Sequence, residues 1–343
     1  MQPNDPTRPS INPRQVIEAR GVDALAELLA ATGYIVPRRI LTDLKHSLRS
    51  RKPLLIEGPR GGGKTGLAEA LAEACNLTTF YLQGTEELTL ADLLYSWDRE
   101  EQREFVREER ERGTPVAEIR ARKWARQFLT LGEALGAFAY AAQSDVPPIF
   151  ILDEVDKLTA IIEDMLLQLL GRGFASVPRL EGTIGVTEKS QWPIVILLSN
   201  NIRHELSEPL RSRCIYCWME PPTAREEVLI LRRRVPAAPA HLLAGVVKIT
   251  GCIRLDMPQV RDKPGLREAI DLLSILTADG VERLTEETIE EYLAFLGKKQ
   301  KELFNLRHGL ARLEEAAGSS DEKIDGWVAE AFADRSDGET NED

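Results

Sequence analysis

The sequence lacks the segments that place a protein in a membrane or send it out of the cell. No apolar run approaches the roughly 18 residues that a membrane-spanning helix needs. The opening stretch, MQPNDPTRPSINPRQ, has no apolar core of the kind that signal peptides carry. We therefore expect no association with membranes.

Excess positive charge is also missing. The 343-residue chain has a net charge of −11, which excludes a general nucleic-acid binder and a protein held on membrane surfaces by its charge. A local basic patch is still compatible with that total. The sequence shows no internal repeat either.

Cysteine is too scarce for a disulfide framework. Four cysteines in a chain of this length favour a reducing compartment, so we predict a cytoplasmic protein. Cys214 and Cys217 form a lone C-x-x-C, but no further ligands stand at the spacing of a zinc site. A thioredoxin-like motif would lie at a helix N-terminus, whereas this stretch has the pattern of a buried strand. We interpret the pair as packed core thiols.

Short apolar runs separated by helical patterns dominate what the sequence does contain. The runs that predict strands are residues 53–56, 79–82, 148–152, 194–199 and 215–219. Helical periodicity is clearest over residues 15–35, 37–49 and 64–75. Such alternation predicts an α/β fold in which a parallel sheet is covered by helices on both faces.

The length suits two folded domains with tails. Residues 1–15 are rich in Pro and Asn and are predicted to be disordered. We place an α/β domain at 16–222 and a smaller, all-helical domain at 223–317. The remaining segment, 318–343, reads as an acidic solvated tail, because the last 23 residues hold nine acidic and two basic residues. Alternatively, its Trp327 and Phe332 dock on a partner.

The segment after the first predicted strand has the pattern of a phosphate-binding loop. It fits G-x-x-x-x-G-K-[ST] at every position, and the predicted nucleotide site consists of Gly58, Pro59, Arg60, Gly61, Gly62, Gly63, Lys64, Thr65 and Gly66. Glycines allow positive φ and bring N–H groups against phosphates, and the following helix points its positive end there. We expect Lys64 to reach the β- and γ-phosphates of ATP and Thr65 to ligate Mg²⁺. The alternative, a chance glycine-rich turn, is disfavoured by the flanking strand and helix.

An acidic pair ends the run at 148–152. Asp153 and Glu154 follow it directly, and in a parallel sheet the carboxyl ends of strands lie where ligands bind. We assign Asp153 to the metal and Glu154 to the general base that polarises the attacking water. The alternative is a helix N-cap formed by Asp153 or Asp156, and an N-cap at Asp156 is compatible with the catalytic assignment.

The run at 194–199 also ends in polar residues. Asn200 is our candidate for orienting the attacking water, with Asn201 as the fallback. Among the arginines that follow, we choose Arg213 to reach the γ-phosphate of a neighbouring subunit, with Arg211 as its competitor. Taken alone, each arginine would be interpreted as a solvated surface residue.

One further arginine opens a helix in the second domain. Arg267 is placed to lean over the nucleotide and report its state to the helical domain. The competing interpretation is an i, i+4 ion pair between Arg267 and Asp271.

In this order the motifs resemble those of the AAA+ ATPases. The stretches LLIEGPRGGGKT, FILDEVDK and IVILLSNNIRHELSEPLRSRCIYCWMEPP resemble, more narrowly, the MoxR family and its CoxD-like branch. The likeness covers about residues 23–275. It implies an α/β nucleotide-binding domain with a helical lid in a hexameric ring. It also implies that Asn200 is sensor 1, Arg213 the arginine finger and Arg267 sensor 2.

The same resemblance implies partners. Such ATPases commonly act with a protein that carries a von Willebrand factor A domain, as chaperones for complex assembly or metal-cofactor maturation, so a protein client is expected.

Two features depart from the family pattern. Arg60 adds positive charge to the phosphate loop, and the segment 96–126 is longer and more charged than expected. We predict that 96–126 is an insertion and 174–193 a hairpin, which face either the ring pore, a partner or only solvent.

Three functional classes share the phosphate loop. An ATP-driven remodelling chaperone agrees best with the acidic chain and with the lack of an appended helix-turn-helix or zinc module. A nucleic-acid-directed AAA+ loader or motor is the alternative, and a DNA-stimulated, salt-dependent ATPase rate would favour it. An inactive nucleotide-bound scaffold is disfavoured because the predicted hydrolytic residues are all present.

Overall fold

The computed structural model describes residues 5, 7–59, 61–200 and 205–333. The chain divides into two compact units. The first comprises residues 1–32, 36–58 and 64–218, and the second comprises 33–35, 59–63 and 219–343. The change from one unit to the other after Trp218 lies four residues before the predicted end of the α/β domain at 222.

A five-stranded parallel sheet organises the first unit. Its strands are β1 (Leu54–Glu57), β2 (Thr79–Gln83), β5 (Ile149–Asp153), β8 (Ile194–Ser199) and β9 (Ile215–Trp218), in the spatial order β2-β5-β8-β1-β9. Every pairing is parallel. The predicted fold class and all five predicted strands are therefore confirmed.

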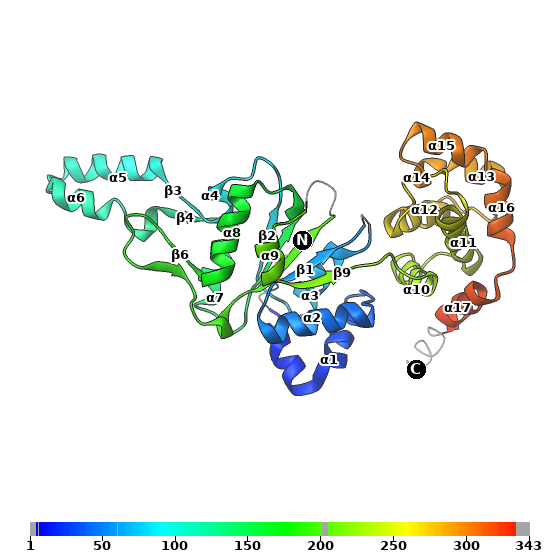
Figure 1. The fold of residues 1–343 in the computed structure, drawn as a ribbon, viewed down its shortest axis with the longest axis horizontal. Helices are drawn as coiled ribbons and strands as arrows, with labels where there is room; N and C mark the ends of the chain where they lie inside the picture. Colours follow the sequence, from blue (N-terminus) through cyan, green and yellow to red (C-terminus); the bar gives the residue numbers. More distant parts are fainter. Residues whose placement is uncertain (1–4, 6, 60, 201–204, 334–343) are drawn as a thin grey trace. The chain divides into compact units, whose positions relative to one another are not determined.

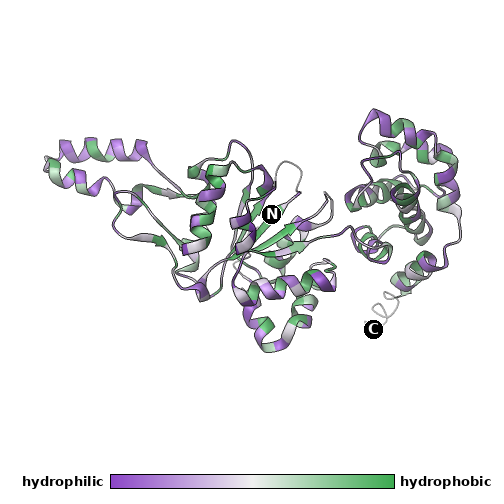
Figure 2. Cartoon of the chain, in the orientation of Figure 1, coloured by the Kyte–Doolittle hydropathy of each residue, from purple (hydrophilic) through white to green (hydrophobic). Residues whose placement is uncertain are grey.

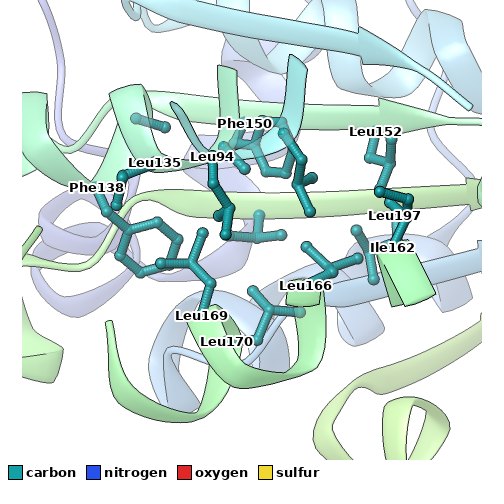
Figure 3. Packing of buried hydrophobic residues seen from close by; sticks show 14 of the residues in the cluster. Leu94, Leu135, Phe138, Phe150, Leu152, Ile162, Leu166, Leu169, Leu170 and Leu197 are labelled. Atoms are coloured by element: carbon teal, nitrogen blue, oxygen red, sulfur yellow. The ribbon is translucent and has the colours of Figure 1, made fainter. Parts of the chain in front are cut away.

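The central strands are hydrophobic throughout because both faces of the sheet are covered (Figure 2). Successive side chains alternate between the faces. On one face Phe150, Leu152 and Leu197 pack with Leu135 and Phe138 of the flanking helix α7 and with side chains of α8 (Figure 3). The alternate strand residues, such as Ile151 and Ile196, are equally buried but lie outside this cluster, because they point to the other face.

The helices of the first unit are α1 (Pro13–Ala31), α2 (Arg38–Ser50), α3 (Lys64–Ala74), α4 (Leu90–Leu93), α5 (Arg99–Glu111), α6 (Val116–Arg122), α7 (Glu133–Ala141), α8 (Ala160–Arg172) and α9 (Glu208–Arg213). Three short 3₁₀ turns join them: η1 (Arg126–Phe128), η2 (Val155–Lys157) and η3 (Lys189–Gln191). Helix α1 is kinked at Gly21, whose φ is +80°. It ends before Thr32, so the helix predicted over 15–35 is shorter at its C-terminal end.

The charged segment 96–126 forms a helical hairpin. Helices α5 and α6 extend from a two-stranded base of β3 (Tyr95–Trp97) and β4 (Leu129–Leu131), which pair antiparallel (Figure 1). A second antiparallel pair, β6 (Phe174–Ser176) and β7 (Thr183–Gly185), lies within the region predicted as a hairpin. Gly173 ends helix α8 with a φ of +78°, and an added Cβ there would lie 2.1 Å from the carbonyl oxygen of Val186. Only glycine fits this junction.

The described part of segment 1–15 differs from the predicted disorder. Ile11 N donates to Cys75 O at 2.8 Å, and Ser10 Oγ donates to Asn76 O at 2.8 Å. Arg14 is buried and donates to carbonyls of residues 190, 192 and 193. The segment is ordered because its polar groups satisfy backbone groups just after α3 and just before β8.

The second unit is helical. It contains α10 (Ala224–Arg234), α11 (Ala240–Asp256), α12 (Leu266–Ala278), α13 (Glu286–Glu291), α14 (Leu293–Leu296), α15 (Gln300–Arg307), α16 (Leu310–Gly318) and α17 (Glu322–Ala333). Helix α11 is buried along most of its length and contacts α10, α12, α16 and α17. The unit has a hydrophobic core of its own.

Helix α17 occupies the segment predicted as an acidic solvated tail. Val328 and Ala331 are buried in the core of the second unit, Lys248 Nζ lies 2.6 Å from Asp325 Oδ1, and the Arg232 guanidinium lies 4.0 Å from the centre of the Phe332 ring. Residues 322–333 are thus part of the folded second unit, and the rest of the predicted tail, from 334 onward, lies outside the described residues.

No helix within the described ranges is long and apolar enough to cross a membrane. Cys214 and Cys217 are buried free thiols, and burial raises the pKa of each to about 12. Both therefore stay protonated near neutral pH and pack in the core, as predicted. The described residues also contain no group of three or more His, Cys, Asp and Glu side chains arranged to hold a metal.

Candidate nucleotide-binding site

The loop between β1 and α3 contains two glycines in the left-handed conformation expected of a phosphate-binding loop. Helix α3 begins at Lys64, and Gly61 and Gly63 have φ values of +72° and +87°. L-residues with side chains rarely adopt this region, whereas glycine does so without steric cost. Arg60 lies outside the described residues.

Lys64 and Thr65 follow the glycine loop at the start of α3, and both form hydrogen bonds within the first unit. Lys64 is buried, and its Nζ donates to the carbonyl of Gly58 at 2.9 Å. Thr65 Oγ1 donates to Asp153 Oδ2 at 2.9 Å. Hydroxyl and carboxylate oxygens are hard ligands of the type that Mg²⁺ prefers. Mg²⁺ sites commonly use only one or two protein groups, and the substrate phosphates supply further ligands. The structure thus brings together the two residues predicted to ligate the metal.

The turn after β5 is constrained by its neighbour β2. Asp153 ends β5, and Glu154 has a φ of +53°, which is rare for a residue with a side chain. Gly84 N donates to Asp153 O at 2.7 Å, and an added Cβ on Gly84 would lie 2.3 Å from Glu154 O. The end of β2 therefore fits against this turn only because residue 84 is a glycine.

Two donors bind one oxygen of the Glu154 side chain. Gln83 Nε2 donates to Glu154 Oε2 at 2.6 Å, and Lys157 Nζ forms a hydrogen-bonded ion pair with the same oxygen. The hydrogen bond from Lys157 is the largest influence that lowers the pKa of Glu154, and Gln83 adds to it. Glu154 is therefore a carboxylate at neutral pH. Its Oε1 carries no hydrogen bond from the described part of the chain.

Sequence reasoning assigned no role to Gln83 or Lys157. Gln83 is paired with Asp153 in the register of β2 and β5. Its position beside the acidic pair could have been found only with the strand order in hand. Lys157 stands three residues after Glu154 in the 3₁₀ turn η2, so that contact is local.

Asn200 follows the last residue of β8. Its backbone N–H donates to Asp156 Oδ1 at 3.2 Å, and Asp156 is buried. Asp156 therefore ties the end of β8 to the turn after β5, and the N-cap of α8 is Thr159, so the N-cap alternative for Asp156 is wrong. Asn201, the fallback, lies outside the described residues.

The two candidate arginines on α9 have different surroundings. Arg211 Nη2 lies 3.7 Å from Glu57 Oε2, and Glu57 is buried at the end of β1. Arg213 is exposed, and its Nη1 donates to Pro209 O at 3.1 Å. Arg211 is thus engaged inside its own chain, whereas the only partner of the exposed Arg213 side chain among the described residues is a backbone carbonyl.

Arg267 lies in the first turn of α12, in the second unit. It is exposed, and no ion pair joins it to Asp271 among the residues that the structure describes. Gly61 belongs to the same unit, and an added Cβ there would lie 3.9 Å from Arg267 Cβ. This proximity places the predicted sensor arginine beside the glycine loop, and the ion-pair alternative is not observed.

Two sequence comparisons find similar proteins. Residues 53–214, just under half of the chain, match the family described as AAA domain (dynein-related subfamily). The chain is also 24% identical over 248 residues to the gas vesicle ATPase GvpN2 of Halobacterium salinarum, an alignment that covers 70% of this chain and 67% of that protein. Residues 53–214 are therefore similar to an AAA domain, and this range contains the phosphate loop, Asp153, Glu154, Asn200 and Arg213.

Solved structures give weaker likenesses. The RuvB Holliday junction branch migration motor of Thermotoga maritima aligns with 78% of this chain and 70% of its own at a TM-score of 0.40 and 16% identity. A mutant of the same protein aligns with 88% of this chain and 83% of its own at a TM-score of 0.44 and 15% identity. At these scores the likeness supports no argument about function.

Proposed function

We propose that the chain is a Mg²⁺-dependent ATPase of the AAA+ class, of MoxR type, that works in a ring and remodels a protein client. The observation that carries the ATPase proposal is the hydrogen bond between Thr65 and Asp153. It brings together a hydroxyl of the phosphate loop and a strand-end carboxylate, the two protein groups that hold Mg²⁺ in P-loop ATPases. GvpN2, by its name an ATPase, supports the same activity.

Each residue in the site has a distinct proposed role. Lys64 and the glycine loop bind the phosphates of ATP, and Thr65 and Asp153 would hold Mg²⁺. When bound, the ion neutralises charge that develops on the phosphates. Glu154 accepts the proton of the attacking water through Oε1, because Gln83 and Lys157 both engage Oε2. Asn200 orients that water, and Arg213 acts on the nucleotide of a neighbouring subunit.

The wider role is also a proposal. A hexameric ring, a partner with a von Willebrand factor A domain and a chaperone-like role in complex assembly or metal-cofactor maturation rest on the sequence resemblance. Placement in the CoxD-like branch rests on the same stretches. The exposed position of Arg213 at the end of α9 supports the ring, because this arginine has no charged partner among the described residues of its own chain.

The test separates binding from hydrolysis. Glu154→Gln keeps the shape of the side chain and removes the base, so ATP should still bind while steady-state turnover falls roughly 10²–10⁴-fold. Lys64→Ala should weaken ATP binding itself. Nucleotide affinity and phosphate release are measured for both variants and for Glu104→Gln, a control on the exposed face of α5. Turnover near the wild-type value in Glu154→Gln would falsify the assignment of the base.

A further inference from the structure

The hairpin of α5 and α6 neutralises part of its charge internally. Buried Glu109 receives Arg112 Nη1 at 2.7 Å, Arg122 Nη1 at 2.9 Å and the Thr114 hydroxyl at 2.9 Å. The Arg122 guanidinium also lies over the ring of Phe105. These contacts hold the two helices together, so the paired arginines have a structural explanation.

Three other cations have no such partner. Arg99, Lys123 and Arg179 surround the indole of Trp124 at 5.7, 4.9 and 4.3 Å from its centre. Arg99 and Arg179 are exposed, and Lys123 is half-buried. Across the described residues none of the three side chains forms an ion pair or a hydrogen bond. We call these three cations and Trp124 the cation–indole cluster.

The cluster is assembled from three separate elements. Arg99 begins α5, Lys123 follows α6, and Arg179 comes from the turn between β6 and β7. Trp97 of β3 holds the indole from the side, because its ring meets that of Trp124 edge-on at 5.1 Å. Packing against Trp97 therefore helps to position the indole that the three cations surround.

The backbone at Arg179 adds an independent observation. Its φ is +72°, a left-handed conformation that disfavours side chains, and glycine would relieve the strain. Yet position 179 carries an arginine whose guanidinium reaches Trp124. Three like charges around one ring also repel one another in the absence of an anion. Strain and repulsion together are costs that an anionic ligand would offset.

We propose that the cation–indole cluster is a docking surface for an acidic polypeptide segment, one with several Asp or Glu side chains in a short stretch. Charge complementarity carries the proposal, because these unpaired cations stand together on a chain with a net charge of −11. Each of the two guanidinium groups can donate a pair of N–H hydrogen bonds to one carboxylate, the geometry that arginine favours. The surface lies on residues other than those of the ATP site, so the proposal does not rest on hydrolysis.

A polypeptide fits the cluster better than a nucleic acid does. Single-stranded nucleic acids bind by stacking bases on open aromatic faces, whereas cations already lie over the faces of Trp124. The adjoining helix α5 is mostly hydrophilic (Figure 2) and holds six glutamates against four arginines. The phosphate backbone of a nucleic acid would extend beyond the cluster and be repelled by the glutamates of α5. A short acidic peptide would contact the cluster alone.

The experiment measures binding of a fluorescein-labelled oligoglutamate peptide to the full chain by fluorescence anisotropy at low salt. Replacing Arg99, Lys123 and Arg179 together by Gln should weaken binding roughly tenfold or more. The matched control replaces Arg103, Arg107 and Arg110, which are exposed cations along α5, by Gln. It makes the same change in net charge and should retain nearly wild-type affinity. An oligoglutamine peptide of equal length should not bind.

A single substitution separates binding from folding. Arg179→Gly removes one cation and relieves the positive φ, so the Tm should stay equal or rise while affinity for oligoglutamate falls severalfold. If Arg179 served only the fold, its replacement by glycine would not weaken the binding of oligoglutamate. The proposal is overturned if both triple variants bind the peptide equally. It is also overturned if a single-stranded oligonucleotide binds through the cluster and the peptide does not.

Discussion

The Glu154 carboxylate shows how a single residue can be tuned by its neighbours. The hydrogen bond from Lys157 holds the pKa of Glu154 below its usual value, so the base stays ionised until the pH falls through that lowered pKa. Lys157→Met removes the largest cause and raises the pKa toward its ordinary value. The acid limb of the kcat–pH profile should therefore move to higher pH.

The comparison for this prediction is Lys301→Met, a change at an exposed lysine in the second unit. Its acid limb should coincide with that of the wild type. If the Lys157→Met profile also coincides with the wild type, then either Lys157 does not set the pKa of Glu154 or Glu154 is not the base that the profile reports.

At the same scale, the sequence identifies residues whose roles follow from local spacing. Lys64, Thr65, Asp153 and Glu154 stand in motifs whose geometry is set by one loop and one strand end, so the pattern alone predicts them. The contact of Gln83 with Glu154 depends on β2 lying next to β5 in register. The two strands lie about seventy residues apart in the sequence, and hydrophobic periodicity does not predict which strands are neighbours in the sheet.

Helix α1 and the segment before it show an element that tertiary contacts determine. The Arg14 guanidinium donates to the carbonyls of Ser190, Trp192 and Pro193 at 2.9–3.3 Å, and burial lowers the pKa of Arg14 to about 10, so the group remains charged at pH 7. Arg14→Met should lower the free energy of unfolding by about 1–3 kcal/mol, because buried carbonyls lose their donors. The midpoint of urea denaturation measures this change.

Arg20→Met is the control for Arg14. Arg20 lies on the same helix and forms only an exposed ion pair with Glu27, at 3.8 Å, so its loss should change stability by less than about 1 kcal/mol. Equal denaturation midpoints for the two variants would mean that the buried hydrogen bonds of Arg14 contribute little to the stability of the fold.

Two segments at the chain ends mislead sequence reasoning for the same physical reason. Composition predicts solvation for residues 1–15 and for the acidic stretch after 318, since both are polar. However, composition does not predict which backbone groups a segment can hydrogen-bond or where a few apolar side chains will pack. Val328 and Ala331 stand three residues apart on α17 and enter the core of the second unit, although acidic residues outnumber them.

At the scale of the whole molecule, the proposed hydrolytic site is divided between copies of the chain. The structure distinguishes the two candidate fingers, because Arg211 pairs with the buried Glu57 and Arg213 is exposed. Loss of Arg211 should therefore disturb its own subunit, and loss of Arg213 should disturb a neighbour. These two outcomes can be separated only in mixed assemblies.

Mixing two inactive variants tests this division. An Arg213→Ala subunit should bind ATP at its own loop but fail to activate its neighbour, and a characterised arginine finger contributes roughly 10³–10⁵ in rate because it stabilises charge on the transferred phosphoryl group. A Lys64→Ala subunit binds ATP poorly at its own phosphate loop but keeps Arg213, its proposed arginine finger. Each variant alone should be nearly inactive, whereas mixed rings contain interfaces that join an intact loop to an intact finger, so ATPase activity should reappear.

The comparison is a mixture of Arg211→Ala with Lys64→Ala subunits. If only that mixture recovers, Arg211 is the finger, and if neither recovers although light scattering shows mixed rings, the site is not shared between subunits.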